Sequence, residues 1–87
     1  MIKLKKGVSI SALKPQMVLA ILVINDIYKS HGSSELTITA GDDGKHSVTS
    51  LHYSGNAIDI RTRMFEDFEK EQIAKEIKAA LGIDFDV

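Results

Sequence analysis

The stretch MVLAILVINDIYKSHGSSELTITA, residues 17–40, decides the fold because it joins a long apolar helix to an alternating strand. Its first eight residues are all apolar, a run far too short to span a bilayer, so we expect a well-buried core helix. Ser11 is the expected N-cap, Pro15 fits the first helical turn, and Gly32 suits a stop after His31. Apolar residues occupy much of the circumference, so the helix should lie under a sheet and contact other elements as well. They are Met17, Leu19, Ala20, Ile21, Leu22, Ile24, Ile27 and Tyr28.

The rest of the chain predicts further strands and a second helix. ELTITA, residues 35–40, alternates polar and apolar residues with β-branched side chains, which is typical of a strand. In AIDIRT, residues 57–62, Ile58 and Ile60 should face the core, and Asp59 the opposite side. IDFDV, residues 83–87, alternates like the opening of a third strand.

Residues 65–82 have the spacing of an amphipathic helix that stops at Gly82. The apolar positions are Phe65, Phe68, Ile73, Ile77, Ala80 and Leu81. Together these elements predict an α+β fold, with two helices packed on a small, mainly antiparallel sheet.

Composition limits the classes of function. Eighty-seven residues form a single small domain, 1–87, of low expected stability. The chain has no cysteine, so disulfides and thiolate zinc sites are excluded and a metal would need imidazole and carboxylate ligands. A net charge of −1 gives no field that attracts nucleic acid or an anionic membrane. The start, MIKLKKGVSI, is a poor signal peptide, so we expect a cytoplasmic protein.

The candidate site lies in SLHYSGNAIDIR, residues 50–61. Asp59 should point outward beside the small Ala57, which leaves room for an ion, and the glycine-containing turn can fold His52 over the same face. Ser50 is suited to hold the loop by hydrogen bonds. One imidazole and one carboxylate suit zinc, but hydrolysis needs a third protein ligand and a water. From the residues alone, a metal site and an ordinary loop entering a strand both remain open.

The segment also has the pattern Ser-x-His-x-x-Gly-x-Ala-x-Asp, carried by Ser50, His52, Gly55, Ala57 and Asp59. It resembles the zinc-binding motif of the M15 peptidases, the D-alanyl-D-alanine carboxypeptidase and dipeptidase group. That group shares its fold with phage L-alanyl-D-glutamate endolysins and the hedgehog signalling domain. The resemblance covers roughly residues 8–87 and implies a hedgehog/DD-peptidase-like fold, with His52 and Asp59 as zinc ligands. Tyr53 would line the substrate cleft or cover the site, and Ser50 and Tyr53 are the expected substrate-binding residues.

The chain departs from the family pattern after the motif. The family takes its third ligand from a later histidine, with a catalytic glutamate a few residues before it, but no histidine follows His52 here. We therefore expect a domain incomplete at its C-terminus, an unknown catalytic residue, and weak or incomplete zinc binding. The family's arginine ahead of the motif is replaced by AGDDG, residues 40–44.

Other acidic residues and histidines have simpler interpretations. His46 is either a substitute third ligand or a solvated loop residue. His31 should interact with the negative end of a helix dipole. Asp42 and Asp43 suit a turn, although acidic loops can also bind a cation. Asp84 and Asp86 should share one face of the last strand, either solvated or as substitutes for the missing catalytic carboxylate.

Two functions follow as expectations. The first is a zinc-dependent peptidase-like domain directed at peptidoglycan peptides, of the D-Ala-D-Ala carboxypeptidase or endolysin type, with weak or no activity as the 87-residue chain. The alternative is a non-catalytic M15-fold binding module that binds a small ligand or a protein. If the protein is phage-encoded, we expect it in the host cytoplasm. The 87 residues could also be a fragment of a longer chain. In any of these cases, an exposed sheet edge could pair with a second copy. His52 and Asp59 should lie on one side of the sheet, with side chains about 4–6 Å apart.

Overall fold

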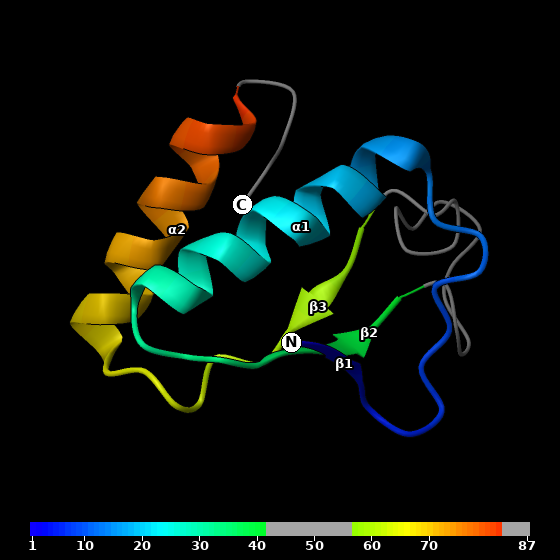
Figure 1. Ribbon diagram of the computed structural model, residues 1–87, viewed down its shortest axis with the longest axis horizontal. Helices are drawn as coiled ribbons and strands as arrows, with labels where there is room; N and C mark the ends of the chain where they lie inside the picture. Colours follow the sequence, from blue (N-terminus) through cyan, green and yellow to red (C-terminus); the bar gives the residue numbers. More distant parts are fainter. Residues whose placement is uncertain (42–56, 83–87) are drawn as a thin grey trace.

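A small sheet and two helices make up residues 1–41 and 57–82, the part of the chain that the computed structural model describes (Figure 1). The order along the chain is β1 (Ile2–Leu4), α1 (Pro15–Ser30), β2 (Leu36–Ala40), β3 (Asp59–Ile60) and α2 (Asp67–Leu81). The strands lie in the order β1-β2-β3, with β1 parallel and β3 antiparallel to β2. The α+β class is therefore confirmed. The sheet, however, is mixed rather than mainly antiparallel over the described residues.

Helix α1 begins later than its sequence suggested. Its N-cap is Lys14, which makes no side-chain capping bond, and Pro15 is the first helical residue. The predicted cap at Ser11 is wrong, because the backbone N–H of Ser11 donates to Ser9 Oγ within a turn before the helix. Proline needs no N–H partner and its φ is fixed near the helical value, so it starts the helix without a polar cap.

The end of α1 follows the predicted pattern. His31 is the C-cap, and Gly32 has a φ of +86°, a conformation that glycine adopts without steric cost. The N–H of Ser33 donates to Tyr28 O and that of Gly32 to Lys29 O, which is the Schellman arrangement. These bonds satisfy the last carbonyls of the helix and turn the chain directly into β2.

The hydrophobic core lies between the two helices and the sheet. Tyr28 of α1 and Leu36 and Ile38 of β2 are each 0% exposed. The two helices contact each other, and α1 also contacts β2. The buried cluster consists of Ile21, Ile24, Tyr28, Leu36, Ile38, Phe65, Ile73 and Ile77. Alternate residues of β2 therefore face the helices, as its sequence pattern predicts.

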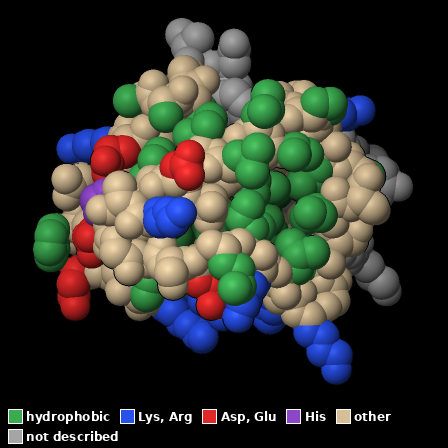
Figure 2. Space-filling view, viewed as in Figure 1, with side chains coloured by type: hydrophobic (Ala, Val, Ile, Leu, Met, Phe, Trp, Pro, Cys, Tyr) green, Lys and Arg blue, Asp and Glu red, His purple; other side chains and the backbone are tan. Residues whose placement is uncertain are grey.

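One side of α1 is less buried than its sequence suggested. Val18, Leu19 and Leu22 are 46%, 64% and 52% exposed. Figure 2 shows hydrophobic side chains gathered on the surface over α1. Within the described residues, contacts to the sheet and α2 cover one face of the helix only. Neither described helix has the length and hydrophobicity that a membrane crossing requires.

Strand β1 was not expected from the sequence. All three of its residues are exposed, and it pairs in register with β2, Ile2 opposite Leu36 and Leu4 opposite Ile38. The N-terminal ammonium donates to Ser34 O, and Leu36 N donates to Met1 O. Residues 3–6 include three lysines, so the sequence does not resemble a strand, because charged residues are depleted in strands and are tolerated mainly at a sheet edge.

Helix α2 corrects the predicted role of two aromatic residues. The helix begins at Asp67, so the buried Phe65 precedes it. Phe68 is 73% exposed, and its predicted place on the apolar face is wrong. Ile73 and Ile77 are buried, and Phe68 lies five residues before Ile73, which turns it to the opposite side of a helix with 3.6 residues per turn. Gly82, with a φ of +86°, follows the last residue as expected.

Candidate functional site

Asp59 is the one proposed metal ligand within the described residues. It opens β3 opposite Ala40, at a point where the pairing with β2 has an irregular register. Asp59 is exposed, whereas Ile58 and Ile60 are half-buried and pack against the core cluster. The alternation predicted for this segment is therefore confirmed at these three positions, and the Asp59 carboxylate is on the side away from the core.

Strand β3 is shorter than the segment 57–62 predicted from sequence. Arg61 N still donates to Thr37 O of β2, but Arg61 O accepts a hydrogen bond from the hydroxyl of Tyr28, at 2.8 Å. Phe65 N then donates to Thr62 O in a turn. Because a helix side chain binds the carbonyl after Ile60, β3 ends there and the chain turns towards α2.

The other proposed site residues, His52, Ser50 and Tyr53, lie outside the described residues, as do Gly55 and the alternative ligand His46. The predicted proximity of His52 and Asp59 therefore stays a prediction. So does the strand predicted for residues 83–87, which carry Asp84 and Asp86. Among residues 1–41 and 57–82, no group of three or more histidine, aspartate or glutamate side chains is arranged to hold a metal ion.

Gly41 fixes the position at which the chain leaves β2, next to the residue that pairs with Asp59. It is buried, and a Cβ placed on it would lie 2.2 Å from the backbone oxygen of Ser9 and 3.2 Å from Ile10 Cγ2. A backbone atom cannot move aside as a flexible side chain can, so only glycine fits at this crossing. The segment before α1 is thereby held against the end of β2.

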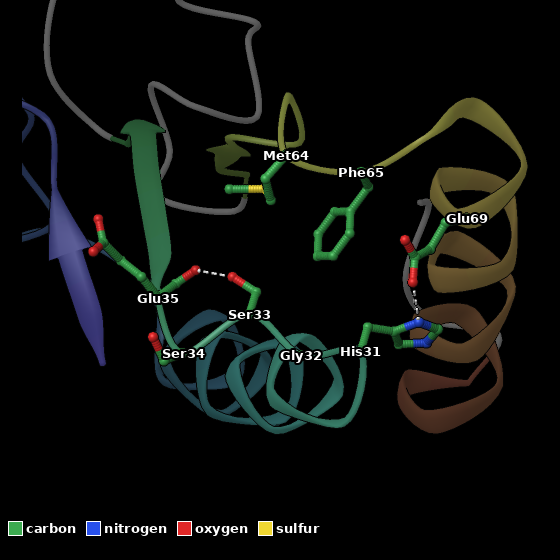
Figure 3. A pocket seen from close by; sticks show the side chains of 8 residues that line it. All are labelled: His31, Gly32, Ser33, Ser34, Glu35, Met64, Phe65 and Glu69. Carbon is green, nitrogen blue, oxygen red and sulfur yellow. Dashed lines mark hydrogen bonds and ion pairs between the residues drawn. The ribbon is translucent and has the colours of Figure 1, made fainter.

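A cleft of about 330 Å³ lies at the other end of β2, beside the connection from α1 to this strand (Figure 3). Its walls come from the α1–β2 connection, from the segment before α2, and from α2 itself. Ala57 and Asp59, the described positions of the motif, are not among its lining residues. The lining residues are His31, Gly32, Ser33, Ser34, Glu35, Met64, Phe65 and Glu69.

His31 lies in the wall of this cleft and contacts two glutamates of α2. Its Nδ1 lies 3.0 Å from Glu69 Oε2, and its Nε2 contacts Glu76 Oε2. Hydrogen bonding to Glu76 and then to Glu69 raises the pKa of His31 above its usual range. The sequence predicted only an interaction with the helix dipole. The signal that was missed is the seven-residue spacing of Glu69 and Glu76, which puts both on one side of α2.

Tyr28 joins the cleft region to β3. Its ring meets Phe65 edge to face, with centroids 5.0 Å apart, and its hydroxyl donates to Arg61 O. Burial raises the pKa of Tyr28 to about 12, so the hydroxyl stays protonated and keeps donating at pH values at which an exposed tyrosine ionises. Comparison of the chain with protein-family models, with curated proteins and with solved structures found no match.

Proposed function

We propose that the chain is a zinc-dependent peptidase-like domain of the M15 type, with a hedgehog/DD-peptidase-like fold and directed at peptidoglycan peptides. The observation that carries the proposal is the motif of Ser50, His52, Gly55, Ala57 and Asp59. It is supported by the exposed position of Asp59 at the start of β3, with Ile58 and Ile60 packed on the other side. A cytoplasmic location belongs to the same proposal.

The proposed chemistry is metal-assisted hydrolysis of a peptide bond. His52 and Asp59 would hold zinc, which supplies Lewis acidity and an activated water. Ser50 would hold the motif loop, and Tyr53 would contact the substrate. No histidine follows His52 in the sequence, so the 87 residues supply an incomplete ligand set and an unassigned general base. We therefore expect weak zinc binding and little or no turnover from this chain.

Calorimetric titration with zinc tests the metal site. The chain should bind zinc weakly, and both His52→Ala and Asp59→Ala should abolish the binding. Asp26→Ala is the matched control, because Asp26 is an exposed aspartate on α1, away from the motif in sequence. If Asp59→Ala and Asp26→Ala bind zinc equally well, Asp59 is not a ligand.

Release of D-alanine or of free amino groups from purified cell wall tests the reaction. The 87-residue chain should release little with or without a chelator, since a positioned general base alone contributes about 10²–10⁴-fold to rate. Robust, chelator-sensitive release would mean that a residue such as His46 completes the site. The variant His46→Ala would then remove the activity.

The second candidate is a non-catalytic binding module of the same fold. The motif residues His52 and Asp59 are compatible with it as well, because binding of a peptide needs no third zinc ligand. Under this proposal, a peptidoglycan stem peptide would bind without being cleaved, and binding would survive Asp59→Ala. Loss of both zinc and peptide binding in Asp59→Ala would favour the peptidase-like site instead.

A further inference from the structure

His31 ends α1, and its side chain reaches across to α2. Its side chain is only 12% exposed. One ring nitrogen faces Glu69 and the other faces Glu76, two turns further along the same helix. Figure 3 shows His31 and Glu69 pointing at each other from the end of α1 and from α2. The imidazole therefore lies between two carboxylates of a neighbouring helix.

The other elements around the ring present different groups. Phe65, in the segment before α2, meets the imidazole edge to face, with centroids 6.4 Å apart. The C-terminal turn of α1 places the negative end of the helix dipole beside the ring. Lys29, the basic residue of that turn, is exposed. Within the described residues, the charged groups in contact with the imidazole are thus Glu69 and Glu76.

Only the cationic imidazole can donate a hydrogen bond to both carboxylates. A neutral imidazole has one N–H donor and one nitrogen lone pair, whereas the cation has two donors. Facing two ionised carboxylates, the neutral ring donates to one and presents its lone pair to the other. The two ring nitrogens point in different directions, so a single metal ion could not bind both nitrogens.

We propose that His31, Glu69 and Glu76 form a pH-dependent clasp, which holds the end of α1 to α2 while the imidazole is cationic and releases Glu76 on deprotonation. Glu76 leaves rather than Glu69 because its side chain is more exposed, 43% against 29%, and is rehydrated at lower cost. His31 and Glu69, whose contact remains after Glu76 leaves, also line the cleft.

The direction of the pH effect follows from the two carboxylates. They raise the pKa of His31 in the folded chain, by hydrogen bonding first and by charge second. The clasp is therefore fully formed below the unfolded-state pKa of histidine, about 6.5. Its contribution to stability is lost as the pH rises through the higher folded-state pKa.

An NMR titration tests the clasp directly. The chain has three histidines, so the double variant His46→Asn, His52→Asn leaves His31 as the single titrating imidazole. We expect its pKa to exceed 6.5, and Glu76→Gln to lower it towards that value. Backbone amides of α2 around Glu76 should shift with the same midpoint, which a solvated surface histidine would not cause.

Glu71→Gln is the matched control, because Glu71 is an exposed glutamate on the same helix. It should leave the pKa of His31 unchanged. A pKa of 6.5 or below, or equal shifts from Glu76→Gln and Glu71→Gln, would overturn the proposal. If the double variant does not fold, the titration is run on the unsubstituted chain. There Glu76→Gln must move one of the three histidine midpoints, and three unmoved midpoints would overturn the clasp.

Discussion

Replacing Tyr28 by phenylalanine should separate two contributions of one buried hydroxyl. Tyr28 is 0% exposed, and its hydroxyl donates to Arg61 O at 2.8 Å. The substitution keeps the ring, and hence the edge-to-face contact with Phe65, but removes the donor. Loss of such a bond, with a carbonyl left unsatisfied, costs about 1–2 kcal/mol. At pH 7 we therefore expect Tyr28→Phe to lower the free energy of unfolding by that amount.

At alkaline pH the same comparison should reverse. Burial raises the pKa of Tyr28 to about 12, above the value near 10 in an unfolded chain. A phenol that ionises more readily when unfolded stabilises the fold below pH 10, and this contribution disappears as the pH rises from about 10 to 12. Two pH units correspond to about 3 kcal/mol, which the phenylalanine variant does not lose. The stabilities of the two proteins should converge above pH 10 and cross before 12.

Urea denaturation followed by circular dichroism, at pH 7 and at steps from pH 9 upward, measures both effects. The chain has two tyrosines, so tyrosinate absorbance in a Tyr53→Phe background reports on Tyr28 alone. Equal stability of the two proteins at pH 7 would refute the hydrogen-bond argument. Titration of Tyr28 near pH 10 in the folded protein would refute the burial argument.

Two further substitutions test the packing. Gly41→Ala should destabilise the fold by about 1–3 kcal/mol in urea denaturation, because the new Cβ meets the backbone oxygen of Ser9; unchanged stability would show that this crossing is not tight. Ile38→Ala, at a site 0% exposed, should cost about 2–5 kcal/mol, whereas Leu19→Ala, at a site 64% exposed, should change stability by about 0.5 kcal/mol or less. Similar losses from these two variants would contradict the assignment of the core.

Sequence patterns located the helices well because apolar spacing and terminal glycines act locally. Gly32 and Gly82 both adopt the positive φ expected after a helix. The errors arose where tertiary contacts decide the outcome. Strand β1 forms only by pairing with β2, and Ile2 and its partner Leu36 are 34 residues apart in the sequence. A local sequence pattern does not predict such a distant partner. Phe68 is an error of a different kind: it was counted with the apolar positions of residues 65–82, although it lies five residues before Ile73 and the helical repeat already turns it outward.

Only part of the candidate site could be predicted from sequence patterns. The outward position of Asp59 follows from strand alternation, and the structure has it exposed. The length of β3 did not follow, because the hydrogen bond from Tyr28 to Arg61 O involves residues 33 positions apart. The cluster around His31 was missed for the same reason, since Glu69 and Glu76 lie 38 and 45 residues away.

The parallel pairing of β1 with β2 also has a consequence for the order of folding. A parallel pair closes only after the crossover between its strands, here α1, is in place, and such non-local contacts form slowly. With three exposed residues, β1 has little buried surface to hold it, so it should open locally at far lower free energy than the core. Each opening uncovers the edge of β2 beside Leu36 and Ile38, a ready template for strand pairing with another chain. While it is paired, the N-terminal strand therefore keeps this edge of β2 from pairing with another chain.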